Sequence, residues 1–237
     1  MTQQRYVADE LTHFVGSKLK SDEERFNLLV TILKTGILAP GGSLVNSKLA
    51  SYVFGGSPLD LQDGEIFLTS RVCFCDIPLA DLSIHIKKFG PFGIAFAKRF
   101  LVEKGASPVF YIAEDSLING TLLRGGAFID TIALLLREVG PAVGPEVSPE
   151  RARLNKDQRE LWSGLTWHLL LYLKFFDSHL DDDDHKNYYM EREWRVINGF
   201  RFQLEDVKRI VIPREYAVKF RESLPEYVAQ IHFPPEA

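Results

Sequence analysis

The chain has 237 residues, of which 46% are hydrophobic and 25% are charged, and its formal net charge is −4. This composition is that of a globular protein and excludes a chain that stays disordered. The negative net charge provides no general attraction to nucleic-acid phosphates, although it leaves room for local basic patches.

The sequence predicts a cytoplasmic protein without a membrane partner. The residues that follow Met1 lack the basic stretch and apolar run of a secretory signal, and no segment offers about 18 uninterrupted apolar residues for a membrane span. On a strand, Cys73 and Cys75 would point to the same face, and a bridge between them would be strained. We expect both to be reduced core residues, and we expect no metal.

The first predicted element is a helix near the N-terminus. The polar start includes Leu11-Thr-His-Phe and leads to Ser21-Asp-Glu-Glu, which has the pattern of a capping box. Apolar residues recur at helical spacing as far as Leu33, and Gly36 supplies a left-handed C-cap. The pattern predicts a helix between Ser21 and Gly36, and then a Gly- and Ser-rich loop with a turn of helix at 40–56.

β-branched and aromatic residues predict three strands in the next part of the chain, at 65–74, 92–97 and 109–112. Pro78 is compatible with the first turn of a helix that runs through Leu82 and Ile86 and ends at Phe89-Gly-Pro. Residues 98–104 predict one or two helical turns.

The middle of the chain predicts helices and loops. Residues 117–139 are apolar at helical spacing, and the Gly- and Pro-rich segment 140–150 is a candidate for a long surface loop. Leu161–Phe176 is apolar almost all round, which predicts a buried helix. The acidic loop 178–187 contains Asp181–Asp184, whose side chains point in different directions and lack the spacing of a cation site, so we expect it to be solvated.

The last part of the chain predicts two strands that begin at Glu193 and Val207, a helix through Tyr216 and Phe220, and a final strand at 230–233. Because strand candidates form separated groups with helices between them, we expect an α+β fold. The prediction is a single domain, 1–237, with a mixed β-sheet flanked by helices.

No Walker loop, GxGxxG, HExxH or GxSxG motif occurs, so the candidate chemistry rests on weaker features. The first is His13, just before the helix that ends at Gly36. Its imidazole offers one donor and one acceptor in a plane and can hold a ribose or a carbonyl. The alternative is a histidine that bonds to the backbone and pins the N-terminal segment.

The second feature is the predicted strand that runs from Arg71 into the Asp-x-Pro turn at Asp76. An aspartate in such a turn can cap the next helix, which requires no catalysis. Arg71 within a sheet requires a carboxylate or an anionic ligand as its partner.

The third feature is the predicted strand at Glu193, on which Glu191, Glu193 and Arg195 would share one face. A glutamate beside an arginine stays ionised and can orient a ribose hydroxyl or act as a base. The alternative is an exposed row of alternating charges on a half-buried strand.

Several short blocks can be read together, namely Leu11-Thr-His-Phe, Ile32-Leu-Lys-Thr-Gly, Val72-Cys-Phe-Cys-Asp-Ile-Pro-Leu, His85 with Phe89-Gly-Pro-Phe-Gly-Ile-Ala-Phe-Ala-Lys, Pro108-Val-Phe-Tyr-Ile and Glu193-Trp-Arg-Val-Ile. In this combination the sequence resembles the AbiGi family of bacterial abortive-infection proteins. The resemblance implies an anti-phage defence protein, the antitoxin-like member of a pair, whose partner is a toxin or a phage component. It supplies no catalytic residues.

A second resemblance bears on mechanism. The order of a histidine before a helix, a strand that carries an arginine and a late glutamate is similar to that of DarT-like ADP-ribosyltransferases, which modify nucleic acid using NAD. The resemblance implies that His13 holds the adenosine ribose, that Arg71 lies near the phosphates and that Glu193 positions the attacking group. Phe14 and Asp76 join His13 and Arg71 as candidate NAD-binding residues.

Two functions stay open at this point. One is an ADP-ribosyltransferase-like effector that uses NAD on a nucleic acid or a protein. The other is a non-catalytic antitoxin or phage-sensing protein that binds a partner protein.

Overall fold

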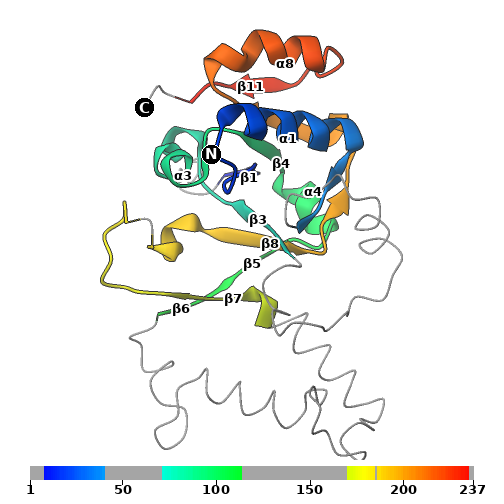
Figure 1. Cartoon of the computed structure of the whole chain (residues 1–237). Helices are drawn as coiled ribbons and strands as arrows, with labels where there is room; N and C mark the ends of the chain where they lie inside the picture. The colour runs from blue at the N-terminus through cyan, green and yellow to red at the C-terminus, as the bar shows by residue number, and fades with distance from the viewer. Residues whose placement is uncertain (1–7, 41–70, 114–169, 185, 235–237) are drawn as a thin grey trace, which may run out of the picture. The chain divides into compact units, whose positions relative to one another are not determined.

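The computed structural model describes residues 8–40, 71–113, 170–184 and 186–234 (Figure 1). The chain divides into two compact units, one formed by Met1–Pro108 with Glu191–Ala237 and the other by Val109–Met190. The single domain over 1–237 stays a prediction. Some predicted segments lie outside the described residues, namely 41–56, 65–70, 117–139, 140–150 and 161–169.

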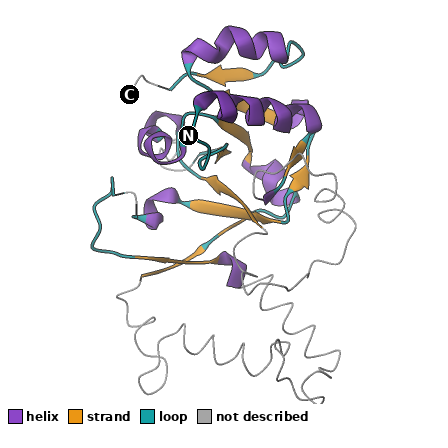
Figure 2. Ribbon diagram, in the orientation of Figure 1, coloured by secondary structure: helices purple, strands orange, loops and turns teal. Residues whose placement is uncertain are grey.

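The first unit is built on a seven-stranded sheet with the order β11-β10-β4-β1-β3-β8-β5. Its strands are β1 (Glu10–Phe14), β3 (Arg71–Cys75), β4 (Gly93–Ala97), β5 (Ser107–Pro108), β8 (Glu193–Ile197), β10 (Val207–Val211) and β11 (Gln230–His232). β10 and β11 are parallel, and the other neighbouring pairs are antiparallel. The sheet is therefore mixed and carries helices, which confirms the predicted α+β class (Figure 2).

Helix α1 (Asp22–Thr35) has the predicted bounds because its start and stop signals are local. The Ser21 hydroxyl accepts the Glu24 N–H, and a Glu24 carboxylate oxygen accepts the Ser21 N–H, which completes the capping box. At the other end Gly36 adopts a left-handed conformation with φ of 62°.

One face of the sheet, called the core face here, packs against three helices. α1, α4 (Lys98–Glu103) and α8 (Ala217–Ser223) place Phe26, Leu101 and Phe220 in one apolar cluster with side chains of five central strands. The sheet side chains of this cluster are Leu11, Val72, Phe74, Ile94, Phe96, Val196, Val207 and Ile210. This cluster is the main core, since its members are almost entirely removed from water.

The opposite face, called the second face here, is covered in part by helix α3 (Ser83–Phe89) and the 3-10 turn Leu79–Asp81. Leu82 and Ile86 pack with Cys75 and Val211 in a smaller apolar cluster. Pro78 begins this helical segment as predicted, and Gly90 ends it. On this face, β3 and β8 also carry polar side chains.

Two short strand pairs complete the described structure. β2 (Ile37–Leu38) pairs with β9 (Phe200–Arg201) in the first unit, and β6 (Phe110–Ala113) pairs in parallel with β7 (Leu173–Phe176) in the second. The predicted helix over Leu161–Phe176 is wrong at its end, because residues 173–176 form β7. The hydrogen bonds of that segment are made with β6, a partner that helical periodicity does not reveal.

Strand β1 was missed by the sequence interpretation, which placed Leu11-Thr-His-Phe in a segment ahead of the first helix. The strand lies in the middle of the sheet, where it pairs with β3 on one side and β4 on the other. Its partners follow it by tens of residues, and its own polar residues weaken the local strand signal.

Candidate functional site

The polar side chains on the second face form a cluster at the centre of the β3–β8 pair. The register places Cys73 opposite Arg195, Cys75 opposite Glu193 and Arg71 opposite Ile197. Residues that lie opposite each other in an antiparallel pair share a face. Arg71, Cys73, Glu193 and Arg195 therefore lie on one face, and this set is called the Cys73 cluster below.

Glu193 and Arg195 form a buried ion pair. Arg195 Nε donates to Glu193 Oε1 at 2.7 Å, and the two side chains are only 5% and 4% exposed. Removal of two charges from water is costly unless each neutralises the other, which this geometry allows. The alternative of an exposed row of alternating charges is therefore wrong for these two residues.

The Cys73 thiol lies within the electrostatic influence of the whole cluster. Burial, followed by the Glu193 carboxylate, raises the pKa of Cys73 to about 12, although Arg195 and Arg71 act in the opposite direction. The nucleophilic form of cysteine is the thiolate. At neutral pH Cys73 is protonated and is not an activated nucleophile.

His13 lies on the core face. Thr12 is opposite Cys75 on the second face, so the neighbouring His13 points the other way, and its ring packs against Phe74 with centroids 5.7 Å apart. Its Nδ1 donates to the Cys73 carbonyl oxygen at 2.8 Å. Burial lowers the pKa of His13, although this hydrogen bond raises it. This is the geometry expected of a histidine that pins the N-terminal strand to the sheet.

Phe14 lies on the second face at the α3 side. Its ring stacks on His85 and Phe89, with centroids 6.3 Å and 5.9 Å apart. His13 and Phe14, predicted together as NAD contacts, thus lie on opposite faces of β1.

Asp76 does not cap the next helix, so that interpretation is wrong. Its Oδ1 accepts the Ala8 N–H at 3.1 Å, and its Oδ2 accepts Lys98 Nζ at 2.9 Å. The N-cap of α3 is Leu82, without a side-chain hydrogen bond. The aspartate instead ties the chain ahead of β1 to the start of α4.

The predicted site residues do not converge on one point. Arg71 and Glu193 share a face, but Glu193 is opposite Cys75, four residues beyond Arg71, which corresponds to about 13 Å along the strand. Asp76 follows the far end of the same strand, and His13 is on the other face. As arranged, these residues do not fit a single NAD site.

A second ion pair of the first unit was not predicted. Lys88 Nζ donates to Glu191 Oε1 at 2.6 Å, and both side chains are largely buried. Glu191 lies in a 3-10 turn and not on β8. Arg192, which separates the turn from the strand, has a positive φ of 44°. Since Lys88 and Glu191 are 103 residues apart in the sequence, no local pattern connects them.

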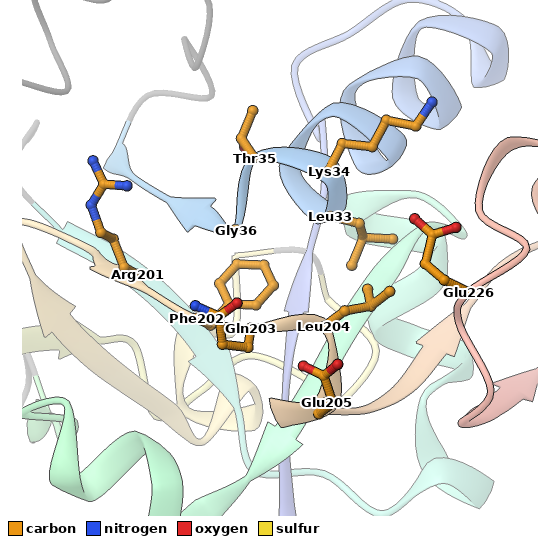
Figure 3. A pocket seen from close by; sticks show the side chains of 10 residues that line it. All are labelled: Leu33, Lys34, Thr35, Gly36, Arg201, Phe202, Gln203, Leu204, Glu205 and Glu226. Carbon is orange, nitrogen blue, oxygen red and sulfur yellow. The ribbon is translucent and has the colours of Figure 1, made fainter.

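A pocket with a volume of about 350 Å³ lies elsewhere in the first unit, between the end of α1 and the turn after β9 (Figure 3). Its apolar lining includes Leu33, Phe202 and Leu204. Charged side chains of both signs surround these residues, namely Lys34, Arg201, Glu205 and Glu226. None of the predicted site residues lines this pocket.

In the part of the chain that the structure describes, no helix is long and apolar enough to cross a membrane. No group of three or more His, Cys, Asp or Glu side chains gathers there in a way that could hold a metal ion.

Comparison with known proteins identifies one family. Residues 68–225 match the family described as abortive phage resistance protein AbiGi, antitoxin. The chain is also similar to the abortive phage resistance protein AbiGi of Lactococcus lactis subsp. cremoris, with 28% identity over 145 residues. That alignment covers 54% of this chain and 50% of the relative, so the chain spans about half of the relative's length. No solved structure matches.

Proposed function

Because the chain belongs to the AbiGi family of abortive phage resistance proteins, we propose that it acts in bacterial defence as an antitoxin-like protein that binds a partner protein. The description of the family as an antitoxin supports this function. An antitoxin that acts by association requires a stable surface that its partner can cover.

The observation that carries the proposal is the state of the Cys73 cluster. The Glu193 carboxylate is bonded to Arg195 within a buried pair, and the Cys73 thiol is protonated at neutral pH. A general base must reach the proton that it removes, and a nucleophile must be ionised. Neither group is in the state that catalysis needs, which favours binding over catalysis.

Co-expression tests the antitoxin-like function. The natural flanking genes are expressed in a phage-sensitive bacterium, alone and together with this chain. If a flanking gene alone slows growth, co-expression of the chain should restore growth, and the complete set should lower the number of plaques. Growth and plaque numbers that do not depend on the chain would contradict the proposal.

The second candidate is an ADP-ribosyltransferase-like effector that uses NAD on a nucleic acid or a protein. One observation favours it, namely that Arg71 and Glu193 share a face on adjacent strands. It requires the NAD site to form without His13, which lies on the other face of the sheet.

Thermal unfolding with NAD decides between the two candidates. A ligand at a hundred times its dissociation constant adds about 2.7 kcal/mol to the free energy of unfolding, which corresponds to roughly 5–11 °C for a chain of this size. We expect no such shift for an antitoxin-like protein. A shift with NAD that is lost in Arg71→Gln but retained in Arg201→Gln, a surface control, would favour the enzyme.

A further inference from the structure

The pocket between the end of α1 and the turn after β9 has the dimensions of a ligand site. Its volume of about 350 Å³ lies within the range of roughly 300–1,000 Å³ that is usual for small-molecule pockets. Three separate parts of the first unit line it, namely residues 33–36, residues 201–205 and Glu226. The fold therefore assembles this concave site from segments that are distant in the sequence.

The apolar lining of the pocket can hold a hydrocarbon group. Leu33 and Phe202 belong to the main core, where each is only 4% exposed, and Leu204 packs against the same core. Figure 3 shows these three apolar side chains between the charged ones. A ligand that covers them removes apolar surface from water, which favours binding.

Two carboxylates lie at this apolar lining. Glu205 and Glu226 both line the pocket and are exposed to solvent. Within the described ranges of the chain, neither carboxylate forms an ion pair or accepts a hydrogen bond. Each carboxylate can therefore accept a charge-assisted hydrogen bond from a cationic ligand.

The end of helix α1 adds negative charge to the pocket. The Gly36 N–H donates to the Ile32 carbonyl oxygen at 3.0 Å and closes the helix. The last carbonyl groups of an α-helix have no partner within it, and they carry the negative end of the helix dipole. In α1 these carbonyls belong to Leu33, Lys34 and Thr35, which all line the pocket. This end of the helix therefore favours a cation.

The two cationic side chains of the lining leave this negative charge in place. Figure 3 shows the Lys34 ammonium group directed away from the apolar side chains. The Arg201 guanidinium lies on the opposite side of Phe202 from the two carboxylates. A ligand on the apolar lining therefore meets carboxylate and carbonyl oxygens, which suit a positively charged group.

We propose that this pocket binds a small organic ammonium ion, specifically a primary amine on an alkyl chain. The chain would cover Leu33, Phe202 and Leu204, and the ammonium group would lie beside Glu205 and Glu226. An ammonium group carries only N–H donors, which complements carboxylate and carbonyl oxygens. A free amine is the expected occupant, because the volume suits a whole small ligand. The inference goes beyond the antitoxin-like function, since it requires no partner protein.

Ligand-observed NMR titration of the full-length protein tests this chemistry. The probes are butylammonium and hexylammonium, and 1-hexanol and hexanoate are the matched neutral and anionic ligands. Hexylammonium should bind about tenfold more tightly than butylammonium, because it buries more of its chain. 1-Hexanol should bind about fivefold more weakly than hexylammonium, because it lacks the charge. Equal affinity for both, or no saturable binding of either ammonium ion, would overturn the proposal.

Paired variants identify the carboxylates that act. Glu205→Gln combined with Glu226→Gln should weaken hexylammonium binding about fivefold, because two exposed ion pairs are lost, and should leave 1-hexanol binding unchanged. Glu215→Gln combined with Glu222→Gln is the control, because both are exposed carboxylates outside the pocket and the net charge changes equally. The control should bind like the unmodified protein. Equal weakening by both pairs would mean that net charge alone attracts the amine, against the proposal.

A lysine-containing peptide with blocked ends separates a free amine from a side chain of another protein. Its lysine carries the same alkylammonium group as butylammonium, so the two ligands differ in the attached backbone. The peptide should bind no more tightly than butylammonium. A peptide that binds more tightly, and loses this advantage in the variant with Glu205→Gln and Glu226→Gln, would replace the free amine by a docked lysine and overturn the assignment.

Discussion

At the scale of single residues, the molecule contains charges in places where a sheet normally carries apolar side chains. Glu193 and Arg195 are 4% and 3% exposed and lie two positions apart on one strand. The pairing offsets part of the cost of removing each charge from water. Loss of one partner is therefore expected to cost more than loss of both.

Replacement of Glu193 by Gln should lower the free energy of unfolding by about 3 kcal/mol, because the buried Arg195 loses the charge of the Glu193 carboxylate. For a chain of this length the melting temperature should fall by roughly 6–12 °C. Urea unfolding measures the effect, and the double variant Glu193→Leu, Arg195→Met is the control. A double variant less stable than Glu193→Gln would show that the pair itself stabilises the fold.

The two thiols predict a loss of stability at alkaline pH. Burial raises the pKa of Cys73 and of Cys75 to about 12 in the folded protein, compared with about 8.5 in an unfolded chain. Between these values the unfolded state loses protons and the folded state does not, so the free energy of unfolding falls as pH rises. The slope is at most about 1.4 kcal/mol per pH unit for each thiol.

Urea unfolding across that pH range checks the slope, and a Cys73→Ser, Cys75→Ala variant should show a flatter dependence. Alkylation gives an independent readout. At pH 8 the half-buried Cys73 should react before Cys75, and both should react much faster in urea. Equal rates in the folded and unfolded protein would contradict the raised pKa values.

At the scale of elements, the backbone contact between the end of α1 and the residue after β9 depends on a glycine. Gly36 has a φ of +62°, and its backbone carbonyl accepts the N–H of Phe202 at 2.9 Å. A β-carbon at this position would lie 2.4 Å from the Phe202 carbonyl oxygen. The backbone at Gly36 therefore packs so closely against the backbone at Phe202 that there is no room for a side chain at position 36.

Gly36→Ala should be more destabilising than Gly105→Ala, which is the matched control. Gly105 also has a positive φ, of 90°, but no atom lies within 4 Å of its added β-carbon. The control should lose only the backbone strain of about 1 kcal/mol, whereas Gly36→Ala adds a steric clash with backbone. Chemical unfolding of the two variants checks the order, and equal losses would rule out the clash.

The elements also show which parts of the structure the sequence could predict. Helix α1 was predicted to the residue because Ser21 and Gly36 act within one turn of its ends. Strand β1 was missed and β7 was assigned to a helix, because both are stabilised by partners distant in sequence. Alternation along one strand is local, so it predicted that Glu193 and Arg195 share a face. The face on which His13 lies depends on the pairing of β1 with the distant β3, so it was not predicted.

At the scale of the whole molecule, the first unit has its most buried strands in the middle of the sheet. The central β4 lies between β1 and β10, and Ile94, Ala95 and Phe96 are completely buried. Among the strands that the structure describes, β11 and β5 lie at the ends of the order, each beside one partner. Stability against local opening should therefore decrease from the centre of the sheet toward its edges.

Hydrogen exchange measures this gradient. Backbone amides of β4 and β1 should exchange most slowly, at rates that approach global unfolding, and amides of β11 and β5 should exchange fastest among the seven strands. Edge-strand amides that are as slow as those of β4 would show that another part of the chain protects them.

The position of β10 has a consequence for synthesis on the ribosome. β4 is complete at residue 97, but its neighbour on one side begins only at residue 207. Until that late segment emerges, a nascent chain exposes one side of β4 with its backbone groups unpaired, which is a site for unwanted association. A fragment that ends before β10 would thus be prone to aggregation, so the sheet can close around β4 only after translation has passed residue 211.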